Sequence, residues 1–237
     1  MHISEQQLRA LVADADEQHR AGMATITEDI RELHEGEGRH LRERVGAGHG
    51  GDAAKLAVAI GAAAIPLGLM AAAGAQAGDG GLAAFAQSVE LAAVEAYKAA
   101  AASGKVTTPA VVTAATTFAG HHTEHAAAFG AAAGSAAKGK PNAKLLTAVG
   151  GQLTAAADEK AILKIAYDLE NAAAATYLFA LGALTSKAAL QLTASILPVE
   201  AQHAVVLGSV LGLKLADIIP SFQTTTGAVN PTDYPVG

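Results

Sequence analysis

Glu200 and His203 lie three residues apart in "LPVEAQHAVVLG" (197–208), a run that is otherwise almost wholly apolar. Residues three apart project from the same face of a helix, so this carboxylate and imidazole can bind one ion together. A buried charge without a partner is costly, so the pair needs a reason to be there. Carboxylate oxygen with imidazole nitrogen suits iron, manganese or zinc. The pair therefore indicates a metal site in a helical core, and a metal-free Glu–His hydrogen bond is the alternative.

Glu or His also interrupts three other long apolar stretches of the chain. Each stretch has the length and composition of a buried helix, and the polar residues fall near its middle. We predict that four helices bring these side chains together as the ligands of one metal centre. The candidate ligands are Glu90, His122, His125, Glu170, Glu200 and His203.

The four stretches form two related pairs. The first stretch of each pair carries Glu followed seven residues later by Tyr, and the second carries His-Ala followed by two spaced Gly. The matched positions are Glu90/Glu170, Tyr97/Tyr177, His125/His203, Gly130/Gly208 and Gly134/Gly212. Because these matches occur in the same order at nearly the same offset, we interpret the chain as two copies of one helical hairpin.

Composition and the spacing of helix breaks predict an all-α protein. Apolar residues make up 51% of the chain and aromatic residues only 4%, so the core must consist of small side chains on good helix formers. Short breaks separate the long stretches, except for one connection at about residues 135–157 that contains a short helical stretch. Two tight hairpins joined by a long crossover are typical of a four-helix bundle.

Residues 80–214 resemble the ferritin-like superfamily of di-metal carboxylate proteins, in particular bacterial ferritin-like domain proteins with an N-terminal hydrophobic segment. That superfamily places one Glu on each of two helices and Glu-x-x-His on each of the other two. The resemblance implies terminal ligands at Glu90 and Glu170, a bridging ligand at Glu200, and nitrogen ligands at His125 and His203. If iron is bound, it also implies oxidation of Fe(II) or reduction of O2 or peroxide.

One position departs from the superfamily's pattern. His122 stands where a bridging Glu is expected, which gives three Glu and three His instead of four and two. An imidazole nitrogen cannot bridge two metals as a carboxylate can. The sequence leaves open a di-metal site bridged by Glu200, a single ion held by three histidines and a carboxylate, and a vestigial polar core. The expected cofactor is a metal ion, with iron as the first choice and manganese or zinc as alternatives.

Other polar residues near these motifs are assigned differently. His121 is expected at the surface or behind the ligands, Glu95 in solvent, and Glu124 on another face of its helix, roughly 200° from His122. The tyrosines of the two copies fit core packing, a hydrogen bond to the site, or a redox role. The N-terminal histidines lack a metal-binding spacing and are predicted to lie at the surface: His2, His19, His34, His40 and His49.

Two segments precede the bundle. Residues 1–52 contain every Arg of the chain and are predicted to form a charged helical segment. Residues 53–78 are hydrophobic and uncharged from Leu56 onward, which is long enough to cross a membrane. We therefore predict a membrane anchor at 56–77, with a cleaved secretory signal and a packed soluble helix as alternatives. The positive-inside tendency then places the N-terminus in the bacterial cytoplasm and the bundle outside the cell membrane.

Residues 215–237 are rich in Pro and poor in apolar residues, so an irregular tail is expected. The N-terminal helix and this tail are the candidate binding segments for protein partners. No dense block of Lys and Arg is present, which argues against a nucleic-acid partner. The chain has no Cys, which excludes disulfides and thiolate ligands.

These features favour a membrane-anchored ferritin-like protein with a Glu/His metal centre in its core. The alternative is a non-enzymatic structural or accessory subunit of a membrane or envelope complex, whose metal site is structural or vestigial. Whether the protein is an enzyme stays open on the sequence alone.

Overall fold

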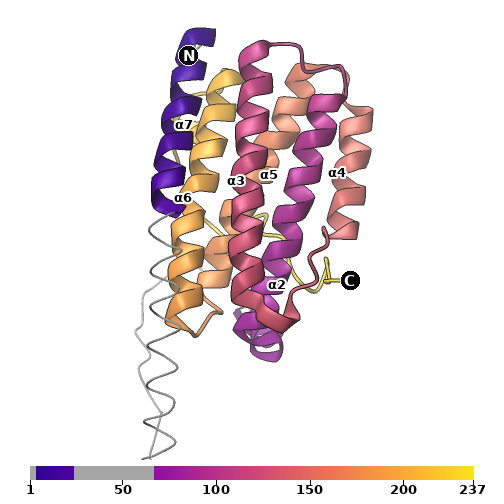
Figure 1. Ribbon diagram of the computed structural model, residues 1–237, viewed down its shortest axis with the longest axis vertical. Coiled ribbons are helices and arrows are strands. Elements are labelled where there is room, and N and C mark those ends of the chain that lie inside the picture. The colour runs from indigo at the N-terminus through magenta and orange to yellow at the C-terminus, as the bar shows by residue number, and fades with distance from the viewer. Residues whose placement is uncertain (1–3, 24–66) are drawn as a thin grey trace, which may run out of the picture.

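The computed structural model describes residues 4–23 and 67–237, and every regular element within them is a helix. Four long helices run side by side in Figure 1: α2 (Leu67–Ala102), α3 (Pro109–Ala133), α5 (Glu159–Leu181) and α6 (Lys187–Val210). Helix α2 packs mainly against α3, and α5 packs mainly against α6. The predicted all-α bundle of two helical hairpins is therefore confirmed.

The connection between the two hairpins contains the short helix η1 (Gly134–Ala136) and α4 (Ala143–Ala155), which packs against α2. The side chain of Asn142 caps α4 by accepting a hydrogen bond from the backbone N–H of Leu145 at 3.1 Å. Its amide group also donates to the carbonyl of Tyr234 in the C-terminal tail at 2.9 Å. Helix α4 and the tail are thus joined on one flank of the bundle.

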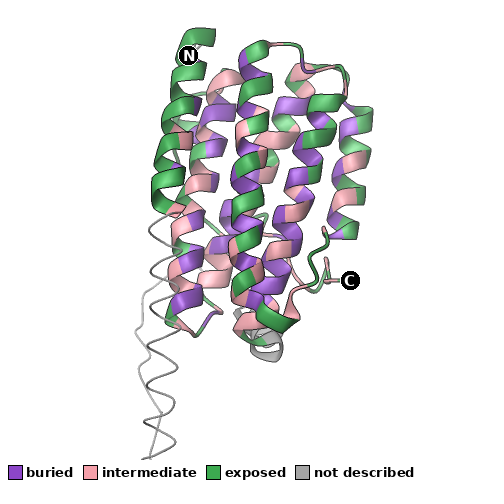
Figure 2. Cartoon of the chain, viewed as in Figure 1, coloured by how far each residue is buried: buried purple, intermediate pink, exposed green. Residues whose placement is uncertain are grey.

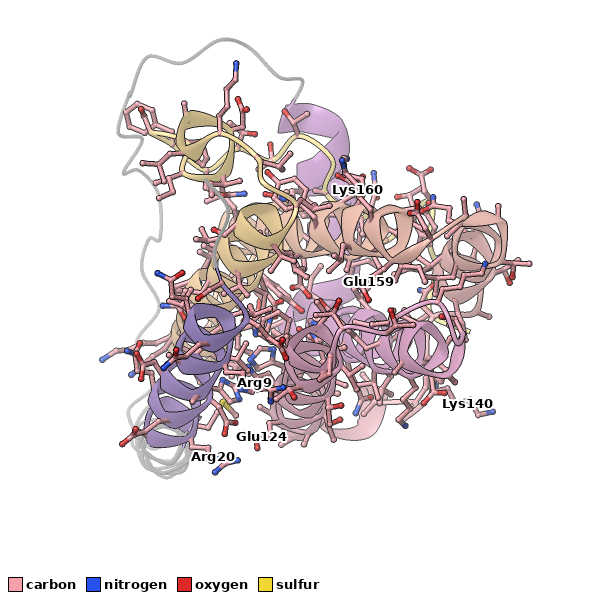
Figure 3. All side chains as sticks on the ribbon, turned by 90° about the horizontal axis from the view of Figure 1, so that it is seen from above. Arg9, Arg20, Glu124, Lys140, Glu159 and Lys160 are labelled. Atoms are coloured by element: carbon pink, nitrogen blue, oxygen red, sulfur yellow. The ribbon has the colours of Figure 1, made fainter. Side chains whose placement is uncertain are left out.

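Carboxylates of one hairpin anchor the loop of the other at each end of the bundle. Glu159 accepts hydrogen bonds from the backbone N–H groups of Thr107 and Thr108 at 2.6 and 2.9 Å, just before α3 begins. At the opposite end Asp79 accepts from the N–H groups of Thr185 and Ser186 at 3.0 and 2.5 Å, just before α6 begins. Negative charge at these helix starts is favourable, so both hairpins are fixed in register. Figure 3 shows Glu159 at the end of the bundle nearest the viewer.

The glycines shared by the two hairpins have the same roles in both copies. A Cβ at Gly208 would lie 2.3 Å from Ile218 Cγ2, and one at Gly130 would lie 2.1 Å from the Gln87 amide, so both positions allow close packing of a neighbour. The second pair, Gly134 and Gly212, has φ of 55° and 71° and follows the ends of α3 and α6. These are left-handed conformations that glycine adopts without steric cost.

A helix over residues 5–23 lies along the bundle beside α6 (Figures 1 and 3). Ser4 and Gln7 cap its start reciprocally: each side-chain oxygen accepts from the other residue's backbone N–H, at 3.2 and 2.8 Å. Its outer face is largely exposed (Figure 2), whereas Leu8 and Val12 are 3% and 2% exposed and belong to the main hydrophobic cluster of the bundle. The N-terminal helix is therefore part of the folded core.

The predicted membrane anchor at 56–77 falls only partly within the described residues. Residues 67–77 form the first part of α2, which is interrupted by non-helical Gly78, and residues 56–66 lie outside the described ranges. Among the helices that are described, none is both long and apolar enough to span a bilayer. The surface predictions for His2, His34, His40 and His49 also lie outside the described residues.

The short helix α7 (Leu215–Ile218) follows α6, and the chain beyond it is mostly irregular up to Gly237. The tail is also bonded to α5: Val229 is buried, and its backbone N–H donates to the hydroxyl of Thr176 at 2.7 Å. The tail therefore covers part of the C-terminal half of α5.

Candidate metal centre

All six candidate ligands meet in the centre of the bundle. Helix α2 supplies Glu90, α3 supplies His122 and His125, α5 supplies Glu170, and α6 supplies Glu200 and His203. Each of the six side chains is at most 2% exposed. The four helices therefore enclose a polar cluster of three carboxyl groups and three imidazoles, the Glu/His cluster, within an otherwise apolar core.

The Glu/His cluster contains two overlapping sets of potential ligands. One set is Glu90, His122, His125 and Glu200, and the other is His122, Glu170, Glu200 and His203. Within each set, one ligand atom of every residue lies within 4.8 Å of the others. His122 and Glu200 belong to both sets, so the cluster offers ligands for one ion or for two.

His122 lies between two carboxylates. Its Nδ1 is 2.6 Å from Glu90 Oε2, and its Nε2 is 3.2 Å from Glu170 Oε1. Burial alone would lower the pKa of His122, but Glu200, Glu170 and Glu90 raise it well above its ordinary value. A doubly protonated ring donates to both carboxylates, so His122 acts as an internal cation at the position where the superfamily has a fourth carboxylate.

The other two imidazoles of the cluster also face carboxylates. His125 Nδ1 is 2.9 Å from Glu200 Oε1, and His203 Nδ1 is 3.2 Å from Glu170 Oε2. Burial would lower the pKa of His125, but Glu90 and Glu200 raise it to about 9. Conversely, burial would raise the pKa of Glu90, but His122 and His125 lower it to about 2. The metal-free cluster is thus stabilised by mutual neutralisation of acids and bases.

His125 and Glu200 have unsatisfied hydrogen-bonding atoms. Both nitrogens of His125 and both carboxyl oxygens of Glu200 are buried and make no hydrogen bond with any described residue, because their close approach lacks hydrogen-bond geometry. Buried polar atoms without partners are rare in folded proteins and costly. A metal ion bound by these atoms would satisfy them. The donor set of carboxylate oxygen and imidazole nitrogen suits iron, manganese or zinc, so the residues present fit a metal.

Tyr97 and Tyr177 connect the two hairpins through the cluster. Tyr97 on α2 donates a hydrogen bond to Glu170 on α5, and Tyr177 on α5 donates one to Glu90 on α2. Burial and the neighbouring carboxylates raise the pKa of both phenols well above the ordinary value, so each keeps its proton. Of the alternatives for these tyrosines, the structure shows a hydrogen bond to the site. Each hairpin therefore orients the carboxylate of the other.

The prediction that His19 lies at the surface is wrong. The residue is 5% exposed, its ring packs against that of His121 with centroids 3.9 Å apart, and its Nε2 lies 3.1 Å from Glu124 Oε2. A usable signal was present, because His19 follows Leu8 and Val12 at helical spacing and so shares their buried face. The histidines of the N-terminal segment lack a metal-binding spacing, so only this helical periodicity indicates that His19 is buried.

The other polar residues near the motifs lie outside the Glu/His cluster. His121 is 2% exposed, and its Nδ1 is 2.9 Å from His203 Nε2, so it lies behind the cluster rather than at the surface. Glu124 is half exposed on the outer side of α3 (Figure 3), and Glu95 is exposed and pairs with Lys98. Neither acid reaches the cluster, as expected.

Comparison with known proteins gives one match. A family model described as a ferritin-like domain matches residues 78–213, which is more than half of the chain and includes all six residues of the Glu/His cluster. No curated protein and no solved structure gives a significant match.

Proposed function

Because the chain belongs to the ferritin-like domain family, we propose that its bundle binds one or two transition-metal ions, iron first, and oxidises Fe(II) or reduces O2 or peroxide. The observation that carries this proposal is the pair of His125 and Glu200. Their four buried polar atoms have no hydrogen-bond partner among the described residues. Glu200 belongs to both ligand sets, and His125 belongs to the first. A purely structural polar core would be expected to satisfy these atoms internally.

In this proposal each hairpin supplies its own Glu–His pair to an ion, and the second hairpin also supplies the shared carboxylate. Glu90 and His125 would hold one ion, Glu170 and His203 would hold the other, and Glu200 would be available to both. Iron bound there would supply one-electron exchange with oxygen or peroxide. His122 lies 2.6 Å from Glu90 and 3.2 Å from Glu170, so it would have to release its hydrogen bond to either carboxylate for that carboxylate to hold an ion.

The protein also has a small cavity beside the cluster. A cavity of about 30 Å³ adjoins Glu90, His122 and Glu170, and its other walls are mostly apolar side chains from α2, α4, α5 and the C-terminal tail. A cavity of this volume has room for one or two molecules of the size of water or O2. This supports a small substrate that reaches the cluster from the flank covered by α4 and the tail.

A second candidate function rests on His122. With its two nitrogens paired to Glu90 and Glu170, the metal-free cluster is largely neutralised, so the bundle can fold without an ion. This supports a non-enzymatic structural or accessory role in a larger membrane or envelope complex. The exposed face of the N-terminal helix and the irregular tail would then be the surfaces available to a protein partner.

The membrane anchor at 56–77 and the location of the bundle outside the bacterial cytoplasm remain proposals. One contact constrains them: the N-terminal helix is docked on the bundle through Leu8 and Val12. A single membrane crossing between the two would separate them, so in the proposed topology this helix would leave the bundle. The contacts of the docked helix would form only if both regions lie on the same side of the membrane. The chain has no Cys, so one can be introduced at a chosen position. Glu17→Cys and Glu95→Cys each place one at an exposed site, in the N-terminal helix and in the bundle respectively. Labelling of intact cells with a membrane-impermeant maleimide then shows whether the two regions face the same side of the membrane.

Metal analysis and oxygen consumption test the main proposal. Full-length protein from iron-supplemented cells should contain one or two equivalents of metal, and the metal-free protein reloaded with Fe(II) should consume O2. Replacing Glu200 and His203 by Ala should abolish both, whereas Glu95→Ala, which removes an exposed carboxylate from α2, should change neither. Wild-type protein that takes up no iron, manganese or zinc would contradict the proposal. Metal uptake without O2 consumption would favour the accessory role.

A further inference from the structure

A line of hydrogen bonds leads from the Glu/His cluster to the N-terminal helix. His203 Nε2, on the side of the ring away from the cluster, is 2.9 Å from His121 Nδ1. The other nitrogen of that second ring, His121 Nε2, is 3.4 Å from Asp16 Oδ1. Asp16 is one helical turn before His19 on the N-terminal helix, and its second oxygen is 2.7 Å from the guanidinium of Arg20. Three residues from three helices are therefore connected in series.

The chemistry of these groups determines where the protons are. A carboxylate only accepts hydrogen bonds, so the bond to Asp16 requires a proton on His121 Nε2. A neutral imidazole carries one N–H, so with that proton on Nε2 the ring of His121 presents Nδ1 as an acceptor. The hydrogen bond between the two rings then requires a proton on His203 Nε2.

This arrangement determines which nitrogen of His203 can bind a metal. Because Nε2 donates a hydrogen bond to His121, only Nδ1 can lose its proton and offer a lone pair. This atom faces the cluster, 3.2 Å from Glu170 Oε2 and 3.4 Å from Glu200 Oε2. Stacking of the ring on Phe118, with centroids 4.0 Å apart, fixes its plane as well.

We propose that the N-terminal helix is part of the metal centre, because Asp16, acting through His121, positions His203 to bind metal through Nδ1. The inference rests on the proposed metal binding. It assigns His121 and Asp16 as positioning residues and gives the N-terminal helix, which lies outside the part of the chain matched by the family model, a role in the site. Outer hydrogen bonds of this kind fix the orientation of metal-bound histidines and strengthen their binding.

The helix has separate means of staying docked. Leu8 and Val12 bury the apolar part of its inner face, and Asp16 is only half-buried. Removing the Asp16 carboxylate should therefore leave the helix in place and act on the hydrogen-bonded line alone. Asp14, exposed on the same helix two residues earlier, offers a matched control with the same change in charge.

The test uses the full-length, metal-free protein with Co(II) and Zn(II) as the probes. Affinity measured by competition with a chelator should fall about 10- to 100-fold for Asp16→Ala and His121→Ala. Asp16→Asn retains an acceptor oxygen and should lose less, and Asp14→Asn should match the wild type. Thermal unfolding of each metal-free variant checks that the fold is kept.

A spectroscopic measurement separates positioning from a purely structural role. In the Co(II)-loaded wild type, the Nε2 proton of His203 should give a paramagnetically shifted NMR signal that exchanges slowly with water. In Asp16→Ala this signal should broaden, because the proton exchanges faster with water. The inference is overturned if Asp16→Ala and His121→Ala bind Co(II) as tightly as the wild type while His203→Ala does not. A wild type that binds neither ion overturns the proposed function and this inference together.

Discussion

Tyr97 donates a hydrogen bond from its phenol to the carboxylate of Glu170, so the first hairpin orients a carboxylate of the second. In the reciprocal bond, Tyr177 of the second hairpin donates to Glu90 of the first, so each hairpin bonds a carboxylate of the other. Carboxylates in an apolar core need such partners, because an ionised group without hydrogen bonds is strongly disfavoured there. The repeated Glu and Tyr of each hairpin are thus halves of an arrangement that exists only when both hairpins are assembled.

Tyr97→Phe should lower the free energy of unfolding by about 1–3 kcal/mol, because it leaves a buried carboxylate oxygen without its donor while the ring still fills its space. Urea unfolding of the metal-free protein measures this. Tyr167→Phe is the control, since its hydroxyl bonds the carbonyl of Asp217 at an exposed site and its loss should cost much less. Equal losses of unfolding free energy in the two variants would show that the buried bond to Glu170 contributes no more to stability than the exposed one to Asp217.

His122→Glu should lower the stability of the metal-free protein and strengthen its binding of metal. It removes the internal cation between Glu90 and Glu170 and adds a fourth acid, so the metal-free protein should lose about 3–5 kcal/mol or fail to fold. Added Fe(II) or Mn(II) should restore stability more than in the wild type, since a carboxylate can bridge two ions. His122→Gln, which removes the charge and adds no carboxylate, should also be destabilised without metal, and added metal should restore less of its stability than in His122→Glu. Thermal unfolding with and without metal distinguishes these outcomes.

The sequence predicted the bundle and the six clustered residues because both depend on local patterns. Helical spacing and the repeat place Glu90 with Glu170, and His125 with His203, before any packing is known. The role of His19 depends instead on where a separate helix docks, which spacing along the chain does not determine. The crossed bonds from Tyr97 and Tyr177 were unforeseen for the same reason: each tyrosine bonds the glutamate of the other copy, whereas the repeat pairs it with the glutamate on its own helix.

Asp79→Asn should reduce the dependence of stability on acid pH. Burial would raise the pKa of Asp79, but hydrogen bonds from Thr185 and Ser186 outweigh it and lower the pKa below the ordinary value. A lowered folded-state pKa means that the contribution is full above the unfolded-state pKa, about 3.9, and is lost as pH falls through the folded value. The wild type should therefore lose more stability than Asp79→Asn between about pH 5 and pH 2. Urea midpoints across that range measure the difference, and parallel curves for the two proteins would contradict it.

Gly208→Ala should destabilise the protein, whereas Gly150→Ala should stabilise it. A Cβ at Gly208 would lie 2.3 Å from Ile218 Cγ2 and 3.0 Å from the ring of Tyr167, so α7 must shift to make room, at a cost of about 1–3 kcal/mol. Gly150 lies within α4, and a Cβ there meets nothing within 4 Å. Alanine at that position should add roughly 0.5–1 kcal/mol through its helix propensity. Both values come from urea unfolding, and a loss at Gly150 equal to that at Gly208 would rule out close packing against α7 as the cause.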